Sequence, residues 1–99
     1  MATDVALPGE GYYFAPTLLR NVPRDAEAAR EEIFGPVASI LRVNDYEAAI
    51  EAANDTPFGL SSGIFTSSLK HASDFRRRSA AGMVMVNLPT AGVDYHVPF

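Results

Sequence analysis

Two adjacent glutamates, followed closely by an aromatic residue and a Gly-Pro turn, are the residues of this chain best suited to chemistry. Glu31 and Glu32 lie just ahead of Phe34 and Gly35-Pro36. Neighbouring side chains on a helix point about 100° apart, so the two carboxylates cannot share a proton as an acid–base pair. A carboxylate beside a phenyl ring can instead contact one ligand jointly, because its two oxygens suit a ribose diol and the ring face suits a flat heteroaromatic group. By residue type alone, two solvated glutamates near a short helix remain the simpler interpretation.

Other reactive residue types form no convincing site. The chain has no cysteine, which excludes disulfides, thiolate metal sites and thiol catalysis within it. His71 and His96 are far apart in the sequence, so we expect no metal site. Ser, His and Asp all occur, but no spacing among them suggests a catalytic triad. His71 and Asp74 lie three positions apart, and we expect them to form a surface contact on a helix.

Composition is that of a small globular domain. The 99 residues are 47% hydrophobic and 20% charged, which argues against disorder. A net charge of -4 disfavours nucleic acid as a partner, and the basic run Arg76 to Arg78 is better explained as a solvated helix end. The start of the chain shows no secretory signal, and the apolar run Met83 to Val86 is too short to span a membrane. We therefore expect a soluble cytoplasmic protein.

Three helices are expected. The most regular has Tyr46, Ala49, Ile50 and Ala53 on one face, and Asn44 with Glu47 resembles a capping box at its start. An earlier helix is predicted over Asp25 to Ile33, before the Gly35-Pro36 stop. A later one, capped by Ser67 or Ser68, places Leu69, Ala72 and Phe75 at spacings of three and ends in the arginines before Gly82.

Short apolar runs bounded by Gly or Pro predict the extended segments. The expected segments are Tyr12–Phe14, Thr17–Leu19, Val37–Val43, Leu60–Thr66 and Met83–Val86. From Val37 onward, strands and helices alternate, which predicts an α/β fold with a parallel β-α-β-α-β unit and a three-stranded sheet. Two helices can hardly cover both faces of such a sheet, so we expect the chain to dock onto further protein or to self-associate.

Several stretches resemble one known family. Residues 31–37 (EEIFGPV) resemble the segment that holds the nicotinamide end of the cofactor in the aldehyde dehydrogenase superfamily. Further blocks resemble the same family in the same order: residues 11–17 (GYYFAPT), 52–60 with 63–66 (AANDTPFGL and GIFT), 82–87 (GMVMVN) and 98–99 (PF). Matching blocks in order are far more specific than any one alone, and together they cover nearly the whole chain.

The resemblance implies a role for three residues. Glu32 occupies the position that hydrogen-bonds the nicotinamide ribose hydroxyls, and Phe34 the position that packs near the nicotinamide ring. Phe99 matches an aromatic residue that lines the substrate tunnel, with Asn87 to Pro98 forming part of its rim. That loop is most similar to loops of enzymes that act on polar semialdehydes such as 2-oxoglutarate semialdehyde.

The chain also departs from the family pattern. The cysteine nucleophile, the glutamate base, the oxyanion-hole asparagine and the nucleotide-binding fold of the family have no counterpart here. Residues 1–99 are therefore expected to form a single partial domain, a C-terminal fragment of the catalytic domain. The intact enzyme would use NAD or NADP to oxidise an aldehyde, whereas this chain alone would bind no cofactor and oxidise nothing. The alternative is a non-catalytic α/β module that binds a partner or self-associates.

Overall fold

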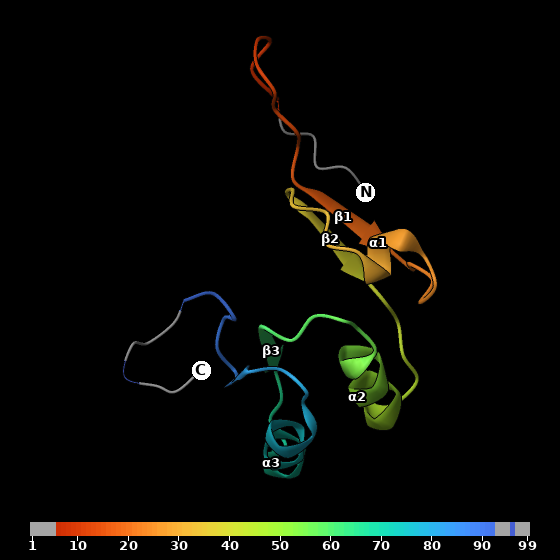
Figure 1. Ribbon diagram of the computed structural model, residues 1–99, viewed down its shortest axis with the longest axis vertical. Helices are drawn as coiled ribbons and strands as arrows, with labels where there is room; N and C mark the ends of the chain where they lie inside the picture. The colour runs from red at the N-terminus through yellow and green to blue at the C-terminus, as the bar shows by residue number, and fades with distance from the viewer. Residues whose placement is uncertain (1–5, 93–95, 97–99) are drawn as a thin grey trace. The chain divides into compact units, whose positions relative to one another are not determined.

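The chain alternates strands and helices along its whole described length. A computed structural model describes residues 6–92 and residue 96, which divide between two compact units, Met1–Arg42 and Val43–Phe99. Each unit contains one two-stranded sheet with parallel strands. The two strands of the first unit are seen side by side in Figure 1. The predicted α/β class and the β-α-β-α-β order after Val37 are confirmed.

The first unit is a β-α-β crossover. Strand β1 (Thr17–Arg20) runs parallel to β2 (Val37–Ile40), with Thr17 opposite Val37, and helix α1 (Glu27–Arg30) connects them. Backbone bonds extend the ladder at both ends, from the Thr17 N–H to the Pro36 carbonyl (2.8 Å) and from the Val22 N–H to the Ile40 carbonyl (3.2 Å). Residues 12–14, which we expected to be extended, form no strand.

Helix α1 is shorter than the sequence predicts. It covers Glu27–Arg30 rather than Asp25 to Ile33, and its N-cap residue, Ala26, offers no side-chain hydrogen bond. Glu31 already has extended backbone angles, φ -106° and ψ 149°. Helix-forming composition describes a local preference only, and the folded chain does not keep this preference beyond Arg30.

The second unit begins with helix α2 (Tyr46–Asn54). Its N-cap is Asp45, whose carboxylate accepts a 2.9 Å hydrogen bond from the Ala48 N–H, so the predicted Asn44 cap is wrong by one residue. Asn and Asp are about equally good caps, and the local sequence therefore cannot choose between them. Ile50 is buried as expected, whereas Ala53 on the predicted apolar face is exposed.

Strand β3 (Ser61–Ile64), helix α3 (Leu69–Arg78) and strand β4 (Met83–Val86) complete the second unit. Ser68 caps α3 by accepting from the His71 N–H at 3.3 Å, and the three arginines occupy its last turn as predicted. Phe75 of α3 and Ile50 of α2, at 5% and 4% exposure, are the only buried hydrophobic residues in the described part of the chain. Leu69, expected on the apolar face of α3, is 81% exposed.

The expected three-stranded sheet is not formed. β2 pairs with β1, and β3 pairs with β4, each in parallel register. Periodicity identifies a buried parallel strand, but it carries no information about which strand becomes the neighbour.

Asn54 joins the end of α2 to the segment after α3. Its amide donates to the Arg78 carbonyl at 2.8 Å, and its side-chain oxygen accepts from the Ala80 N–H at 2.9 Å. These bonds complement the packing of α2 against α3 within the second unit.

Across the described residues, no helix has the length and apolar character needed to cross a membrane.

Candidate functional site

Glu32 and Phe34 lie in the segment between α1 and β2, and both side chains are exposed. Phe34 is 91% exposed although it is a large apolar residue. A cavity of about 270 Å³ opens beside the segment. It is lined by Ala28, Glu31, Glu32, Ile33, Phe34, Gly35, Val37 and Ser39. The structure therefore brings together the carboxylate and the ring that the sequence singled out.

The backbone of Phe34 is in the left-handed region, with φ at 53°. The other described non-glycine residues with positive φ are Asn21 and Asn87, and asparagine tolerates this region far better than an aromatic residue does. The conformation costs ~1–2 kcal/mol for a residue with a Cβ. Since the exposed ring gains almost no packing energy within its own unit, local stability does not account for the strain. A strained residue with an exposed ring at a cavity indicates a functional constraint.

The segment leaves helix α1 abruptly. The Glu31 N–H makes the last helical bond, to the Glu27 carbonyl at 2.8 Å, and Glu31 itself is extended. The next carbonyl, that of Ala28, accepts a 2.6 Å hydrogen bond from the Ser39 hydroxyl on β2. Ser39, which also lines the cavity, thus links α1 to the sheet. Sequence reasoning missed Ser39, because a lone serine in a short strand carries no recognisable signal.

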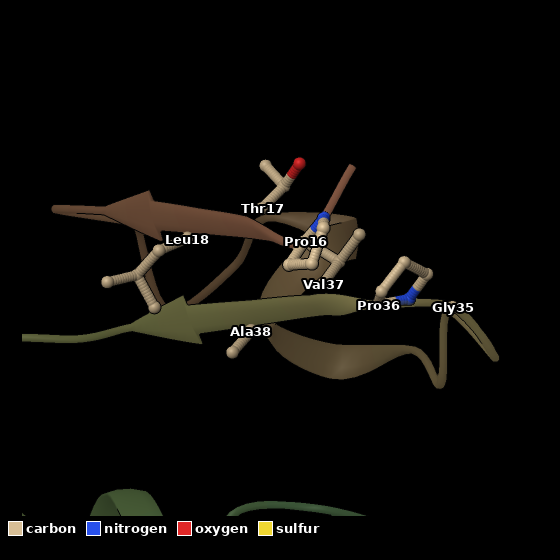
Figure 2. A pocket seen from close by; sticks show the side chains of 7 residues that line it. All are labelled: Pro16, Thr17, Leu18, Gly35, Pro36, Val37 and Ala38. Carbon is tan, nitrogen blue, oxygen red and sulfur yellow. The ribbon is translucent and has the colours of Figure 1, made fainter. Parts of the chain in front are cut away.

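A second, more apolar cavity of about 450 Å³ lies where β1 and β2 begin. Figure 2 shows its lining side chains, which come from the two strand starts and the turn before β2. The lining residues are Pro16, Thr17, Leu18, Gly35, Pro36, Val37 and Ala38. Gly35 and Val37 line both cavities, so the Gly-Pro turn separates a polar site near Glu32 from an apolar surface on the sheet.

The arrangement around Glu32 fits a sugar joined to a flat ring. A carboxylate accepts hydrogen bonds from two neighbouring hydroxyls, and the exposed phenyl face offers a stacking or packing surface. The cavity lining is mixed, with the Glu31 and Glu32 side chains beside apolar Ile33 and Val37. Two acceptor oxygens beside an exposed phenyl face can therefore hold a sugar hydroxyl pair and a flat ring at the same time.

The other predicted site residue, Phe99, lies outside the described residues. The rim loop that precedes it is described as far as Gly92 and begins at Asn87. The side chain of Asn87 accepts from the Thr66 N–H (2.8 Å) and donates to the Thr66 carbonyl (3.0 Å). The loop then returns over β3, where a Cβ added to Gly63 would lie 2.9 Å from the Thr90 methyl carbon. The ends of β3 and β4 thus fix where this loop starts.

The polar cluster on α2 and α3 is structural. The rings of Tyr46 and His71 stack with centroids 4.2 Å apart, and the Tyr46 hydroxyl donates to the Asp74 carboxylate at 3.1 Å. Asp74 also forms ion pairs with Arg77 (3.4 Å) and Arg78 (3.1 Å), and among the described residues no hydrogen bond or ion pair joins it to His71. The arginines, one helical turn away, compete for the same carboxylate and carry a full positive charge. No group of three potential metal ligands occurs among the described residues.

Charge pairing in this cluster shifts the pKa values of its members. Hydrogen bonds from Arg78 (2.7 and 3.0 Å) hold the pKa of Glu47 below its ordinary value. Desolvation raises the pKa of Asp74, but hydrogen bonds from Tyr46 and Arg78 outweigh it, and the net pKa is lowered. Desolvation and the hydrogen bond to Asp74 raise the pKa of Tyr46. These groups join α2 to α3 and face no cavity described above.

The chain is similar in sequence to several dehydrogenases. The chain is 39% identical over 93 residues to a 2,5-dioxopentanoate dehydrogenase of Saccharolobus solfataricus, covering 94% of the chain and 20% of that protein. It is 42% identical over 89 residues to an alpha-ketoglutaric semialdehyde dehydrogenase of Bacillus subtilis, covering 90% and 18%. The chain thus spans about a fifth of the length of these relatives.

Solved structures of dehydrogenases are also similar to this chain. A Thermus thermophilus 1-pyrroline-5-carboxylate dehydrogenase variant matches with a TM-score of 0.88 and 43% identity, over 93% of this chain and 18% of that one. A 1-pyrroline-5-carboxylate dehydrogenase from Thermus with bound NAD matches with a TM-score of 0.81 and 44% identity, over 88% and 17%. The model of the aldehyde dehydrogenase family matches residues 3–99. The chain belongs to the aldehyde dehydrogenase family.

Proposed function

We propose that this chain forms the nicotinamide side of the active site in an NAD(P)-dependent enzyme that oxidises an aldehyde to a carboxylic acid. One observation carries the proposal: Phe34 holds a strained left-handed backbone and presents a 91% exposed ring beside the Glu32 carboxylate at a cavity. The NAD-bound neighbour from Thermus, similar over 88% of the chain, supports it.

Each residue has a binding task in this proposal. The Glu32 carboxylate accepts hydrogen bonds from the two ribose hydroxyls, and the Phe34 ring packs beside the nicotinamide and limits its tilt. The cofactor supplies hydride acceptance when it is bound. The role proposed for Phe99, lining the aldehyde channel, rests on the sequence resemblance, because Phe99 lies outside the described residues. The chain has no cysteine, so a thiolate nucleophile must come from a different segment.

The proposed substrate class is a polar semialdehyde. The relatives named for 2,5-dioxopentanoate and for alpha-ketoglutaric semialdehyde are 39% and 42% identical to this chain. The rim loop from Asn87 onward is the part of the chain that would contact the substrate.

The test uses a chimera in which residues 3–99 replace the matching segment of the Thermus thermophilus enzyme, whose fold is similar. We expect Glu32→Gln to lower kcat/KM for NAD roughly 10-fold or more, since a hydrogen bond to a charged group contributes ~1.5–3 kcal/mol. Glu10→Gln is the control, with the same charge change at an exposed residue outside the cavity lining, and it should change kcat/KM for NAD less than about 2-fold. Equal effects of the two substitutions would refute the assignment of Glu32.

A second candidate function is a non-catalytic module that self-associates. The observation that favours it is exposed apolar surface in the second unit, where Leu60, Phe65 and Leu69 are 66%, 76% and 81% exposed. Light scattering on the 99-residue chain tests self-association. A concentration-dependent mass above that of a monomer supports this candidate, and a sharp monomer peak contradicts it.

A further inference from the structure

We infer that Ser39 is a positioning residue, which ends α1 from a distance and so holds Glu32 where the cofactor needs it. The inference rests on the proposed function of Glu32. Ser39 lies on β2, eleven positions after Ala28, and its hydroxyl donates to the Ala28 carbonyl at 2.6 Å.

That carbonyl is the one that would continue the helix. In an α-helix each carbonyl accepts from the N–H four residues later, so the partner of the Ala28 carbonyl would be the Glu32 N–H. The last helical bond is one step earlier, from the Glu31 N–H to the Glu27 carbonyl. Ser39 takes the next acceptor, and Glu31 turns to φ -106° and ψ 149° at the same point.

Nothing local stops the helix there. Residues 28–32 are alanine, arginine and glutamate, all good helix formers, and the first Gly-Pro occurs only at Gly35-Pro36. A helix through Ile33 is what the sequence predicts. The long-range hydroxyl of Ser39 is the feature that supplies an alternative partner for the freed carbonyl.

The end of α1 decides the direction of Glu32. Each added helical residue turns the side-chain direction by about 100°. An α1 that continued through Glu32 would therefore rotate its carboxylate and move the start of the turn that carries Phe34. Ser39 also lines the cavity beside Glu32, but its hydroxyl hydrogen is donated to the Ala28 carbonyl, so Ser39 acts on Glu32 through the backbone of α1.

The first experiment measures backbone chemical shifts in the full 99-residue chain. In Ser39→Ala we expect the Cα shifts of Glu31, Glu32 and Ile33 to move toward helical values. Ser39→Thr keeps a hydroxyl and should retain the shifts of the parent chain. The matched control is Ser62→Ala, which removes a strand hydroxyl that bonds to Ser79 at 2.6 Å in the other unit. It should leave residues 31–33 unchanged.

Two results in this experiment would overturn the inference. One is unchanged shifts at residues 31–33 in Ser39→Ala. The other is faster hydrogen exchange at the Val22 amide, which donates to the Ile40 carbonyl, in Ser39→Ala. Such a result would show that Ser39 stabilises the sheet as a whole.

The second experiment measures kcat/KM for NAD in the chimera described above. Loss of one net hydrogen bond predicts a roughly 3- to 10-fold decrease for Ser39→Ala, with recovery in Ser39→Thr. Changed shifts without this decrease would overturn the link to the cofactor. If Glu32→Gln also has no effect in the same chimera, the proposed function itself fails. If Glu32→Gln alone lowers kcat/KM, the function stands and only the role of Ser39 is lost.

Discussion

Replacing Phe34 by glycine and by alanine separates the strain at this residue from the role of its ring. Both substitutions remove the phenyl group, but only glycine removes the penalty of a left-handed backbone at φ 53°. Because the ring is 91% exposed, its loss should change the free energy of unfolding by less than about 0.5 kcal/mol. The glycine variant should then be ~1 kcal/mol more stable than the alanine variant.

The assay is amide hydrogen exchange at Val22, whose N–H donates to the Ile40 carbonyl and reports opening of the first unit. A difference of ~1 kcal/mol corresponds to roughly 5-fold slower exchange in Phe34→Gly than in Phe34→Ala. In the chimera, both variants should lower kcat/KM for NAD, because neither has a ring to pack against the nicotinamide. We therefore expect Phe34→Gly to be more stable than Phe34→Ala and to have a lower kcat/KM for NAD than the parent chimera.

Two results would refute this reasoning. If Phe34→Ala destabilises the first unit by more than ~2 kcal/mol, the Phe34 ring packs in a core of that unit and is not free to contact a cofactor. If both variants retain the kcat/KM of the parent chimera, the strain at Phe34 serves no cofactor contact.

Three further predictions follow from the structure and composition. Because the folded-state pKa values of Glu47 and Asp74 are lowered from 4.5 and 3.8, their pairing with Arg78 stabilises the second unit above those values; this contribution is lost as the pH falls through the lowered pKa values. Acid unfolding followed by circular dichroism should therefore be less steep in Arg78→Gln. Gly63→Ala should displace the loop at Thr90, since the added Cβ would lie 2.9 Å from its methyl carbon, and a shift of the Thr90 methyl resonance checks this. The 99-residue chain has no cysteine and should form no NADH from any aldehyde, so turnover at 340 nm that depends on the chain would contradict the assignment of its role.

The sequence by itself determined the features that depend on residues near one another in the chain. The arginines in the last turn of α3 and the bounds of β4 were predicted correctly, and the cap of α3 was narrowed to Ser67 or Ser68, of which the structure uses Ser68. Capping, the helix dipole and short apolar runs all act within a few residues. The Glu32–Phe34 pair was also visible, since a carboxylate and an aromatic ring next to a Gly-Pro turn form a local pattern.

Tertiary structure alone decided the features that depend on distant partners. Helix α1 ends at Arg30 because Ser39, from β2, bonds to the Ala28 carbonyl, and no residue near α1 signals that contact. β2 pairs with β1 because strand neighbours are chosen by the crossover and the packing, which periodicity does not encode. Asp74 bonds to Tyr46 of α2 because the two helices pack together. Local sequence sets preferences of a few tenths to about 1 kcal/mol, and tertiary contacts of comparable or larger energy determine which of these preferences the folded chain keeps.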